Sequence, residues 1–368
     1  MTIRVLHVLP ELQPGGGMST VVMNYLRNIN HDEFIFDVIC HMPYDDSYKL
    51  EVEKYGGKVT YFPKIGLSNI RDSIERVDKY FDNNNYDVVH CHMANAAFIY
   101  LKIAKEKGVG LRILHSHQDH YADTWRHAAR NYPLVSLGKR YANYYVACSI
   151  KAGDFLFGNK TYTILKNSIP IDQYAFKEIV RDNWRYSNNV IDDIVFANIG
   201  RLTLQKNQKF VLDIFSKIHK IIPKSKLFFA GDGELREELH QYSKSLNIQN
   251  EVVWLGNIDI KDLYQGIDVL LFPSLYEGLP MVLVEAQAAG VQSIASNQIS
   301  EEAMVTDFVE ALPIDKGVAP WVEAAVKASS KGGNTNRSNG AIELREAGFD
   351  IYDTVRDLEK IYIDNIRR

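Results

Sequence analysis

The stretch DVLLFPSLYEGLPMVLVEAQAA, residues 268–289, contains a complete strand-to-helix unit. Its apolar run over 268–272 has the length and composition of a buried parallel strand, and Pro273 and Gly278 mark a loop after it. Pro280 suits the first turn of a helix, because its missing N–H would have no partner there. Free backbone N–H groups at such a helix start carry partial positive charge, so this loop is suited to an anion such as a diphosphate.

Two carboxylates stand on either side of this helix start. Glu277 falls in the loop and Glu285 in the second turn of the helix. A carboxylate in that second position can accept hydrogen bonds from two vicinal hydroxyls, such as those of a ribose. The alternative is a charge that complements the helix N-terminus plus one solvated glutamate. Because short motifs recur by chance, the spacing taken alone favours that alternative.

A second strand-to-helix loop supplies positive charge. The run IVFANI, residues 194–199, predicts a strand, and Arg201 and Lys206 follow it before a helix with one apolar face. Arginine offers a planar fork and lysine a point charge, and both suit phosphate oxygens. Each taken singly would be read as ordinary surface charge. Together with the two glutamates they suggest a nucleotide-sugar site.

Apolar runs alternate with helical patterns in two series along the chain, which is typical of βα units and parallel sheets. The expected strands lie near 3–9, 34–41, 58–62, 86–91, 111–116, 144–148 and 162–165, and then near 194–199, 226–230, 251–255, 268–272 and 291–295. Residues 180–193 are polar and lack an apolar face, so we expect the domain boundary there. The expected domains are 1–180 and 181–349, followed by a terminal helix in 350–368.

Composition narrows the class of protein. A chain of 368 residues with 46% apolar content supports two domain cores, and a formal net charge of -4 argues against nucleic-acid binding. Cys40, Cys91 and Cys148 are odd in number and widely spaced, so we expect reduced, buried thiols. We find neither a signal-peptide pattern nor an apolar run of the roughly 18 residues that span a membrane. These features predict a cytoplasmic protein.

A glycine-rich loop follows the first strand. Gly15, Gly16 and Gly17 precede a helical pattern, so the loop can bring backbone N–H groups close to a ligand. It is not a G-x-G-x-x-G fingerprint, which argues against a dinucleotide oxidoreductase.

Histidines cluster at the end of the fifth expected strand. His115, His117 and His120 lie close to Asp119, a composition that suggests zinc. The spacing matches no established ligand motif, so we predict no metal. Alternation along a strand places His115 and His117 on the same side. His117 is then either a site residue or a hydrogen-bonded loop histidine.

In combination these motifs are similar to those of the retaining glycosyltransferases of family 4. The resemblance spans nearly the whole chain and is carried by residues 14–17, 115–117, 147–149, 167–172 and 231–233, with Gly200, Arg201, Lys206, Pro273, Ser274, Glu277, Gly278 and Glu285. Residues 17–25 and 299–307 resemble the bacterial exopolysaccharide and capsule branch. The resemblance implies an α/β GT-B fold, with two Rossmann-like domains whose mainly parallel sheets face a central cleft. It also implies a last helix that packs back on the first domain.

The resemblance further implies metal-independent transfer, with retention, of a hexosyl or N-acetylhexosaminyl group. The donor would be a nucleoside diphosphate sugar with UDP favoured, and the acceptor a hydroxyl of a glycan or polyprenyl-linked intermediate. No cofactor is expected. The implied contacts are Arg201, Lys206, Gly278 and Leu279 with the diphosphate, Gly16 and Gly17 near the donor phosphates, Glu285 with ribose, Glu277 with sugar hydroxyls, and His117 with the sugar near its reacting carbon.

Three alternatives remain open at this point. A sugar-nucleotide epimerase uses a similar fold, and a catalytically idle partner of another transferase would keep the fold without the activity. Intact Arg201, Lys206, Glu277 and Glu285 disfavour both. The third concerns residues 125–145, where basic and aromatic residues alternate. This stretch is either a peripheral contact with the inner face of the cell membrane or, slightly favoured, a helix with a buried aromatic face.

Overall fold

Short apolar runs in the first 167 residues form the strands of one parallel sheet. The structure is a computed structural model and describes residues 2–42, 45–118, 125–331 and 336–366. The strands of this sheet are β1 (Ile3–Leu9), β2 (Phe34–Cys40), β3 (Val59–Tyr61), β4 (Val88–Cys91), β5 (Leu111–Ser116), β6 (Tyr144–Ala147) and β7 (Thr163–Ile164). Their order is β3-β2-β1-β4-β5-β6-β7, and every pairing is parallel.

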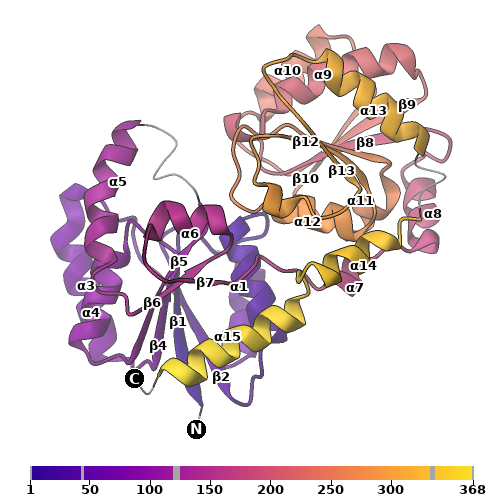
Figure 1. The fold of residues 1–368 in the computed structure, drawn as a ribbon. Helices are drawn as coiled ribbons and strands as arrows, with labels where there is room; N and C mark the ends of the chain where they lie inside the picture. Colours follow the sequence, from indigo (N-terminus) through magenta and orange to yellow (C-terminus); the bar gives the residue numbers. More distant parts are fainter. Residues whose placement is uncertain (1, 43–44, 119–124, 332–335, 367–368) are drawn as a thin grey trace. The chain divides into compact units, whose positions relative to one another are not determined.

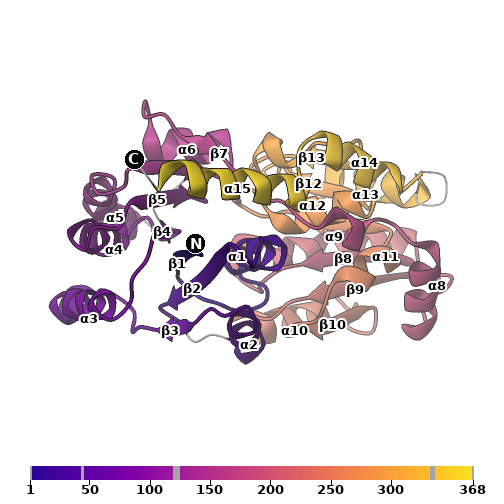
Figure 2. The same cartoon turned by 90° about the horizontal axis from the view of Figure 1, so that it is seen from below.

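Helices cover both faces of this first sheet. They are α1 (Gly17–Asn28), α2 (Asp46–Lys54), α3 (Ile70–Asp82), α4 (Ala97–Glu106), α5 (Trp125–Gly138), α6 (Ile150–Phe157) and α15 (Ile351–Asn365), with a 3-10 turn at Leu67–Asn69. Figures 1 and 2 show α3, α4 and α5 grouped on one face, while α1 packs with α15 on the other. Residues 1–167 and 351–368 together make the first compact unit.

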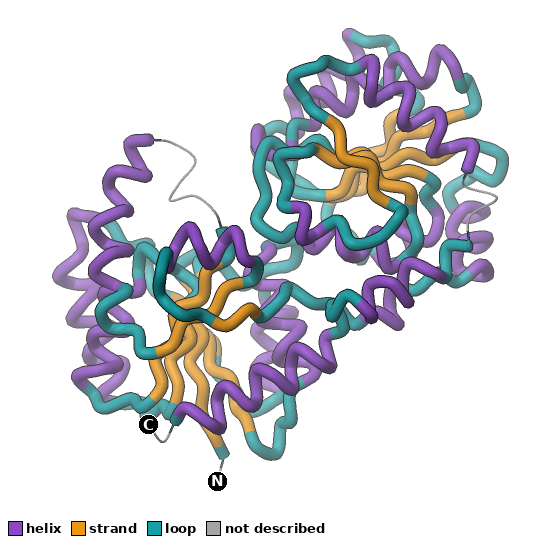
Figure 3. The backbone as a smooth tube through the Cα atoms, viewed as in Figure 1, coloured by secondary structure: helices purple, strands orange, loops and turns teal. Residues whose placement is uncertain are grey.

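Residues 168–350 make the second compact unit around a second parallel sheet. Its strands are β8 (Ile194–Ile199), β9 (Ser225–Ala230), β10 (Val252–Gly256), β11 (Val269–Phe272), β12 (Gln292–Ser296) and β13 (Val309–Leu312), in the order β10-β9-β8-β11-β12-β13. Its helices are α7 (Ile171–Tyr174), α8 (Glu178–Ser187), α9 (Gln208–Ile221), α10 (Arg236–Ser245), α11 (Lys261–Gly266), α12 (Met281–Ala288), α13 (Ala319–Lys331) and α14 (Asn339–Glu346), with 3-10 turns at Leu204–Lys206 and Glu301–Ala303. In both units the strands form the central layer and helices cover them (Figure 3).

The expected fold class is confirmed, since the chain forms two α/β units with parallel sheets. Each strand expected from an apolar run is present, with ends within about two residues of those predicted. One strand, β13, was not predicted. It lies at the edge of its sheet and leaves Glu310 and Ala311 exposed, so it shows no continuous apolar run.

The compact units divide at a different place from the domain boundary expected over residues 180–193. Helix α8 occupies most of that stretch, and the division falls after Asn167. The buried contacts of α8 are made by amphipathic side chains rather than aliphatic ones, which hid its packing face. Trp184 packs on Phe228, with ring centroids 5.2 Å apart, and the buried Arg185 donates to the Gly266 carbonyl at 2.9 Å.

Two further expectations can be compared with the structure. The last helix belongs to the first unit, where Tyr362 is fully buried and α15 packs on α1. Cys40, Cys91 and Cys148 are buried and form no disulfide. Among the described residues, we find no helix with both the length and the apolar character needed to cross a bilayer.

Candidate functional site

Two loops at the carboxyl ends of β8 and β11 are tied together by hydrogen bonds. The amide of Gln205 donates from Nε2 to the Tyr276 carbonyl at 2.9 Å, and the Leu275 N–H donates to the Gln205 carbonyl at 2.8 Å. Asn207, in the left-handed region at φ 56°, donates from Nδ2 to the Pro273 carbonyl at 3.3 Å. Asparagine tolerates that backbone conformation better than most residues. The loop that carries Lys206 is therefore held against the loop that carries Glu277.

Lys206 and Glu277 form an ion pair between these loops. The Lys206 Nζ lies 2.5 Å from Glu277 Oε1, and the two side chains are only 16% and 11% exposed. The same Nζ lies 5.1 Å from the centroid of the Phe272 ring. At Gly200, whose φ is 145°, a Cβ would meet the Lys206 Cε at 3.2 Å. Glycine at this position therefore leaves room for the lysine side chain.

Arg201 opens the same loop and is exposed. Its carbonyl accepts a hydrogen bond from Gln208 Nε2 at 2.9 Å, which fixes the backbone there to the start of α9. The structure thus places both predicted cations and Glu277 at one edge of the second sheet.

Glu285 occupies a different environment from Glu277. Its side chain belongs to α12, is 4% exposed, and accepts hydrogen bonds from Tyr264 Oη at 2.8 Å and Tyr174 Oη at 3.1 Å. Burial raises the pKa of Glu285, and the two phenol hydrogen bonds counteract that shift. The sequence interpretation missed both tyrosines, because they come from α11 and α7 and no short motif links them to Glu285.

The helix start next to these loops begins slightly later than expected. Leu279 is buried, Pro280 takes the N-cap position in an extended conformation, and α12 begins at Met281. The N–H groups of the first turn of α12 therefore follow the loop that carries Glu277 and Gly278.

In the first unit, the glycine loop leads into α1. Gly16 is the N-cap of α1, which begins at Gly17. A Cβ at Gly16 would lie 2.7 Å from Glu11 Oε1 and 2.9 Å from Ser19 Oγ, so only glycine fits without a shift. Gly15 has a positive φ of 79°, which favours glycine there as well.

His117 belongs to a group of five histidines that lie on, or directly after, the adjacent strands β1, β4 and β5 of the first sheet. Two hydrogen-bonded rows run through the group. The His117 row consists of His7, His92 and His117: His7 Nδ1 lies 3.0 Å from His92 Nε2, and His92 Nδ1 lies 2.8 Å from His117 Nε2.

The second row, here the Tyr362 row, consists of Tyr362, His90 and His115. Tyr362 Oη lies 2.8 Å from His90 Nδ1, and His90 Nε2 lies 3.0 Å from His115 Nδ1. The two rows stack on each other, with ring centroids of His90 and His92 4.3 Å apart and those of His115 and His117 4.0 Å apart.

Burial keeps these imidazoles neutral. It lowers the pKa of His7 and of His117 to about 3. Burial, reinforced by neighbouring imidazoles, also lowers the pKa of His90, His92 and His115 well below the usual value. The sequence interpretation found only His115 and His117. The pattern His-x-His at 90–92, which repeats at 115–117 on the neighbouring strand, was the available signal.

Neutral imidazoles are also metal ligands. Ligand atoms of His7, His90 and His92 lie within 4.8 Å of one another, and so do those of His92, His115 and His117. Asp119 and His120, which the zinc interpretation also included, lie outside the described residues.

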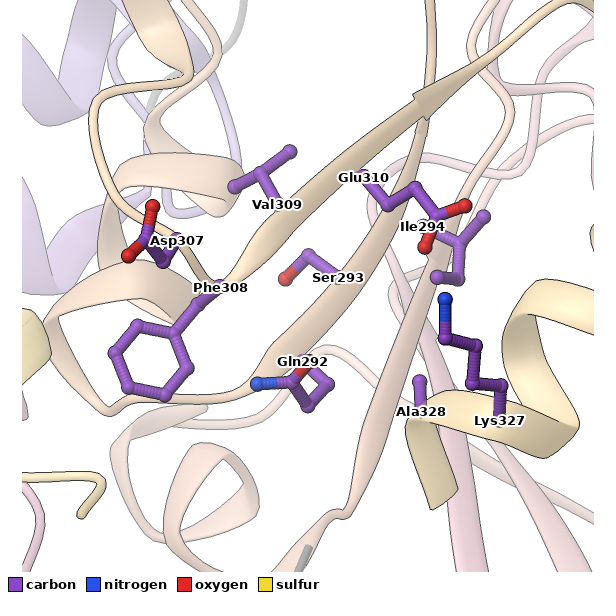
Figure 4. Close-up of a pocket in the computed structure, with 9 residues that line it drawn as sticks. All are labelled: Gln292, Ser293, Ile294, Asp307, Phe308, Val309, Glu310, Lys327 and Ala328. Carbon is purple, nitrogen blue, oxygen red and sulfur yellow. The ribbon is translucent and has the colours of Figure 1, made fainter. Parts of the chain in front are cut away.

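Two cavities of the second unit lie away from these residues. One of about 210 Å³ lies between β12, β13 and α13 (Figure 4). Its lining is Gln292, Ser293, Ile294, Asp307, Phe308, Val309, Glu310, Lys327 and Ala328. A larger apolar groove of about 710 Å³ is lined by α9 and α13 residues, including Ile221 and Val322. The predicted site residues line neither cavity.

Several described residues of the stretch 125–145 pack against, or form hydrogen bonds with, other parts of the first unit. Tyr141 and Tyr145 pack against its core, Tyr144 Oη bonds Thr163 Oγ1 at 2.8 Å, and Lys139 Nζ donates to the Leu156 carbonyl at 2.8 Å. The side chains of residues 125–130, which carry part of the expected basic face, lie outside the described part. These tyrosines lie beyond α5, with Tyr144 and Tyr145 in β6, whereas Tyr132 within α5 is exposed, so the described aromatic residues do not form one buried helix face.

Known proteins are similar to this chain in sequence and in architecture. Residues 15–158 match the family model Glycosyltransferase Family 4, and residues 180–334 match the model Glycosyl transferases group 1. The Bacillus subtilis protein EpsF, named as a glycosyltransferase, is 29% identical over 370 residues, covering 98% of this chain and 96% of that protein. The Escherichia coli enzyme UDP-Gal:α-D-GlcNAc-diphosphoundecaprenol α-1,3-galactosyltransferase is 23% identical over 390 residues, covering 99% of this chain and 97% of the enzyme.

Solved structures give the same fold. The crystal structure of HepE from Anabaena in complex with UDP-glucose matches with a TM-score of 0.80 and 18% identity, over 98% of this chain and 100% of HepE. The architecture is therefore GT-B. Because both family models match in order and the relatives match along nearly their whole length, the chain is similar throughout to the family 4 glycosyltransferases.

Proposed function

We propose that this chain is a retaining, metal-independent hexosyltransferase. It moves a hexosyl or N-acetylhexosaminyl group from a UDP-sugar to a hydroxyl of a glycan or polyprenyl-linked acceptor. The observation that carries the proposal is the Lys206–Glu277 ion pair, held on two tied loops at the carboxyl ends of β8 and β11. Ligands of open parallel sheets bind at that edge.

The positively charged side chains at this edge of the second sheet stabilise charge that develops during the reaction. Lys206 and Arg201, helped by the N–H groups at the start of α12, stabilise the negative charge that develops on the leaving diphosphate. A divalent cation performs the same task in other enzymes, so fixed side-chain charge makes a metal unnecessary here. The N–H groups around Gly16 and Gly17 lie near the donor phosphates.

The remaining groups contact different parts of the donor. Glu277 holds hydroxyls of the transferred sugar, and His117 contacts that sugar near its reacting carbon. Glu285 holds the ribose. The two tyrosines each use one lone pair of its carboxylate, so the other lone pairs are available to vicinal hydroxyls. Retention follows from attack on the face that the diphosphate leaves, without a covalent enzyme intermediate.

The relatives support the choice of donor and acceptor. The Escherichia coli relative takes its sugar from UDP-Gal and its acceptor is a diphosphoundecaprenol-linked sugar, and HepE binds UDP-glucose. We extend both to this chain, with a role in exopolysaccharide or capsule assembly at the cytoplasmic face of the membrane. Peripheral membrane contact stays a prediction, for which flotation with anionic vesicles is the test.

The test begins with a donor screen. Nucleotide sugars are ranked by thermal shift, because a ligand at 100 times its Kd stabilises the native state by about 2.7 kcal/mol. The selected donor is then incubated with lipid extract, with and without EDTA, and the product anomer is read by NMR. Transfer that survives EDTA and keeps the donor's anomeric configuration supports the proposal. Epimerised nucleotide sugar formed without acceptor, or binding with no turnover of any kind, would replace it with an epimerase or an idle partner.

A further inference from the structure

The His117 row is a chain of neutral imidazoles whose protons must be ordered together. Each neutral ring has one N–H and one lone pair, so each N···N hydrogen bond needs a donor on one side and an acceptor on the other. Only two concerted arrangements satisfy both bonds. Either the protons point from His7 through His92 to His117, or all of them point the other way.

The buried end of the row distinguishes the two arrangements. His7 Nε2 is buried and has no hydrogen-bond partner among the described residues. If the protons point toward His117, this atom is a bare acceptor, whereas in the reverse arrangement it is an unpaired N–H. Orphaned buried N–H groups are rarer than under-used acceptors. The first arrangement is therefore favoured, with His7 Nδ1–H donating to His92 Nε2 and His92 Nδ1–H donating to His117 Nε2.

We propose that His92, oriented by His7, is a positioning residue that holds His117 in the tautomer protonated on Nδ1. His117 then offers the transferred sugar a neutral N–H donor rather than a base. This inference rests on the proposed function for its catalytic consequence. The tautomer itself follows from the row alone.

The ring geometry favours this arrangement over a bound cation. The hydrogen-bonded pairs His7–His92 and His92–His117 have centroids 5.3 and 5.1 Å apart, which with N···N distances of 3.0 and 2.8 Å places the rings edge to edge. The lone pair of one ring thus points at the N–H of the next. A metal ion at either trio of histidines would have to break these bonds.

The Tyr362 row provides a matched control. His90 is as deeply buried as His92, also makes two hydrogen bonds and stacks on His92, but it does not bond His117. His92→Phe and His90→Phe each remove two hydrogen bonds and make the same change in side-chain volume. Loss of a partner that orients a metal-bound histidine typically costs about 10-fold to 100-fold in activity, and we expect the same range for the partner of His117. We expect His92→Phe to lower kcat by that factor with little change in KM, and His90→Phe to lower thermal stability while leaving kcat near its native value.

The conservative variant His92→Asn distinguishes loss of orientation from misfolding in His92→Phe. In His92→Asn the side-chain NH₂ can replace the Nδ1–H donor, so we expect this variant to recover most of the kcat. Equal losses of kcat in His92→Phe and His90→Phe, or no recovery in His92→Asn, would overturn the positioning role.

The tautomer is read independently in the native protein. With ¹⁵N-labelled histidine, the His117 signals are identified by their loss in His117→Gln. We expect a protonated Nδ1 and an unprotonated Nε2. A proton on Nε2, or stoichiometric zinc, copper or nickel in the purified chain by mass spectrometry, would overturn the inference. Failure of the native chain to transfer any sugar would instead refute the proposed function, and the NMR result would still decide the tautomer.

Discussion

Lys206 is neutralised by Glu277 in this structure, so donor binding exchanges one anionic partner of the lysine for another. We expect Lys206→Ala to lower the rate of transfer by about 100-fold to 1000-fold, as for loss of one preorganised donor, while the protein stays folded. The measurement is the initial rate at saturating donor, with circular dichroism to check folding. Lys209→Ala, on the exposed side of α9, is the control and should keep the native rate. Near-native turnover of Lys206→Ala would contradict the role assigned to this lysine.

Glu277 and Glu285 are both carboxylates but have different surroundings, so substitutions of the two residues should affect binding and turnover differently. Glu285→Ala should weaken binding of UDP and of the UDP-sugar alike, because the ribose belongs to both. Glu277→Gln removes the counter-ion of Lys206 and a contact to the sugar, so it should lower turnover while UDP binds at least as tightly as before. Calorimetry with UDP and initial rates test the contrast. Equal weakening of UDP binding in both variants would show that this division of labour is wrong.

Part of the site could not be predicted from the sequence, as Tyr264 and Tyr174 show. Glu285 lies in a motif that can be recognised from its spacing to Glu277, whereas Tyr174 meets Glu285 across 111 residues of chain. The same holds for His7 and His92, which are 85 residues apart. Local spacing predicts residues that share a loop or a helix start. Residues that meet only through sheet register need the register itself.

At the scale of elements, apolar runs made the strands predictable because parallel strands are buried on both faces. The sequence did not predict helix α8 because ion pairs, rather than an apolar face, hold it to the rest of the second unit. Asp268 accepts hydrogen bonds from Arg181 Nη2 at 2.5 Å, Arg185 Nη1 at 3.1 Å and the Val195 N–H at 2.8 Å. Asp268 opens the strand-to-helix stretch at residues 268–289, yet its two arginine partners lie where the sequence predicted the domain boundary.

Because α8 is held by these ion pairs, we expect one substitution at Asp268 to lower the free energy of unfolding strongly. Asp268→Ala leaves two arginines of α8 without their buried counter-charge, which typically costs about 3–5 kcal/mol in the free energy of unfolding. Urea denaturation followed by tryptophan fluorescence measures it, since Trp184 lies on the same helix. The control is Asp232→Ala, whose pair with Arg236 is nearly half exposed on both sides. That variant should lose about 1 kcal/mol or less. Similar losses in the two variants would mean that α8 is not held by Asp268.

At the scale of the whole molecule, the five clustered histidines, four of them buried and His117 partly buried, make the first unit sensitive to acid. Their pKa values in the folded state lie below the unfolded value of about 6.5. The stability that this difference contributes is therefore present above pH 6.5 and is lost as the pH falls toward the folded values, about 3 for His7 and His117. In that window the unfolded chain binds more protons than the folded one. Each histidine then costs about 1.4 kcal/mol per pH unit.

We therefore expect the first unit to open before the second on acidification from pH 7 to pH 5. Hydrogen exchange read by mass spectrometry resolves the two units. Peptides of β1, β4 and β5 should lose protection first, while those of β8 and β11 keep it. His7→Phe should reduce the pH dependence by removing one titrating group. Equal protection of both units at pH 5 would contradict this reading of the histidine rows.

The chain enters the first unit twice, with residues 1–167 and again with 351–368, while the second unit is continuous. During translation the second unit can fold as soon as its own residues have left the ribosome, because domains generally fold as units. The first unit must wait for α15, which carries Tyr362, the hydrogen-bond partner of His90, and packs on α1. Until then the surface that α15 will cover is open to chaperones and proteases. The half of the molecule that is synthesised first is therefore the half that completes its fold last.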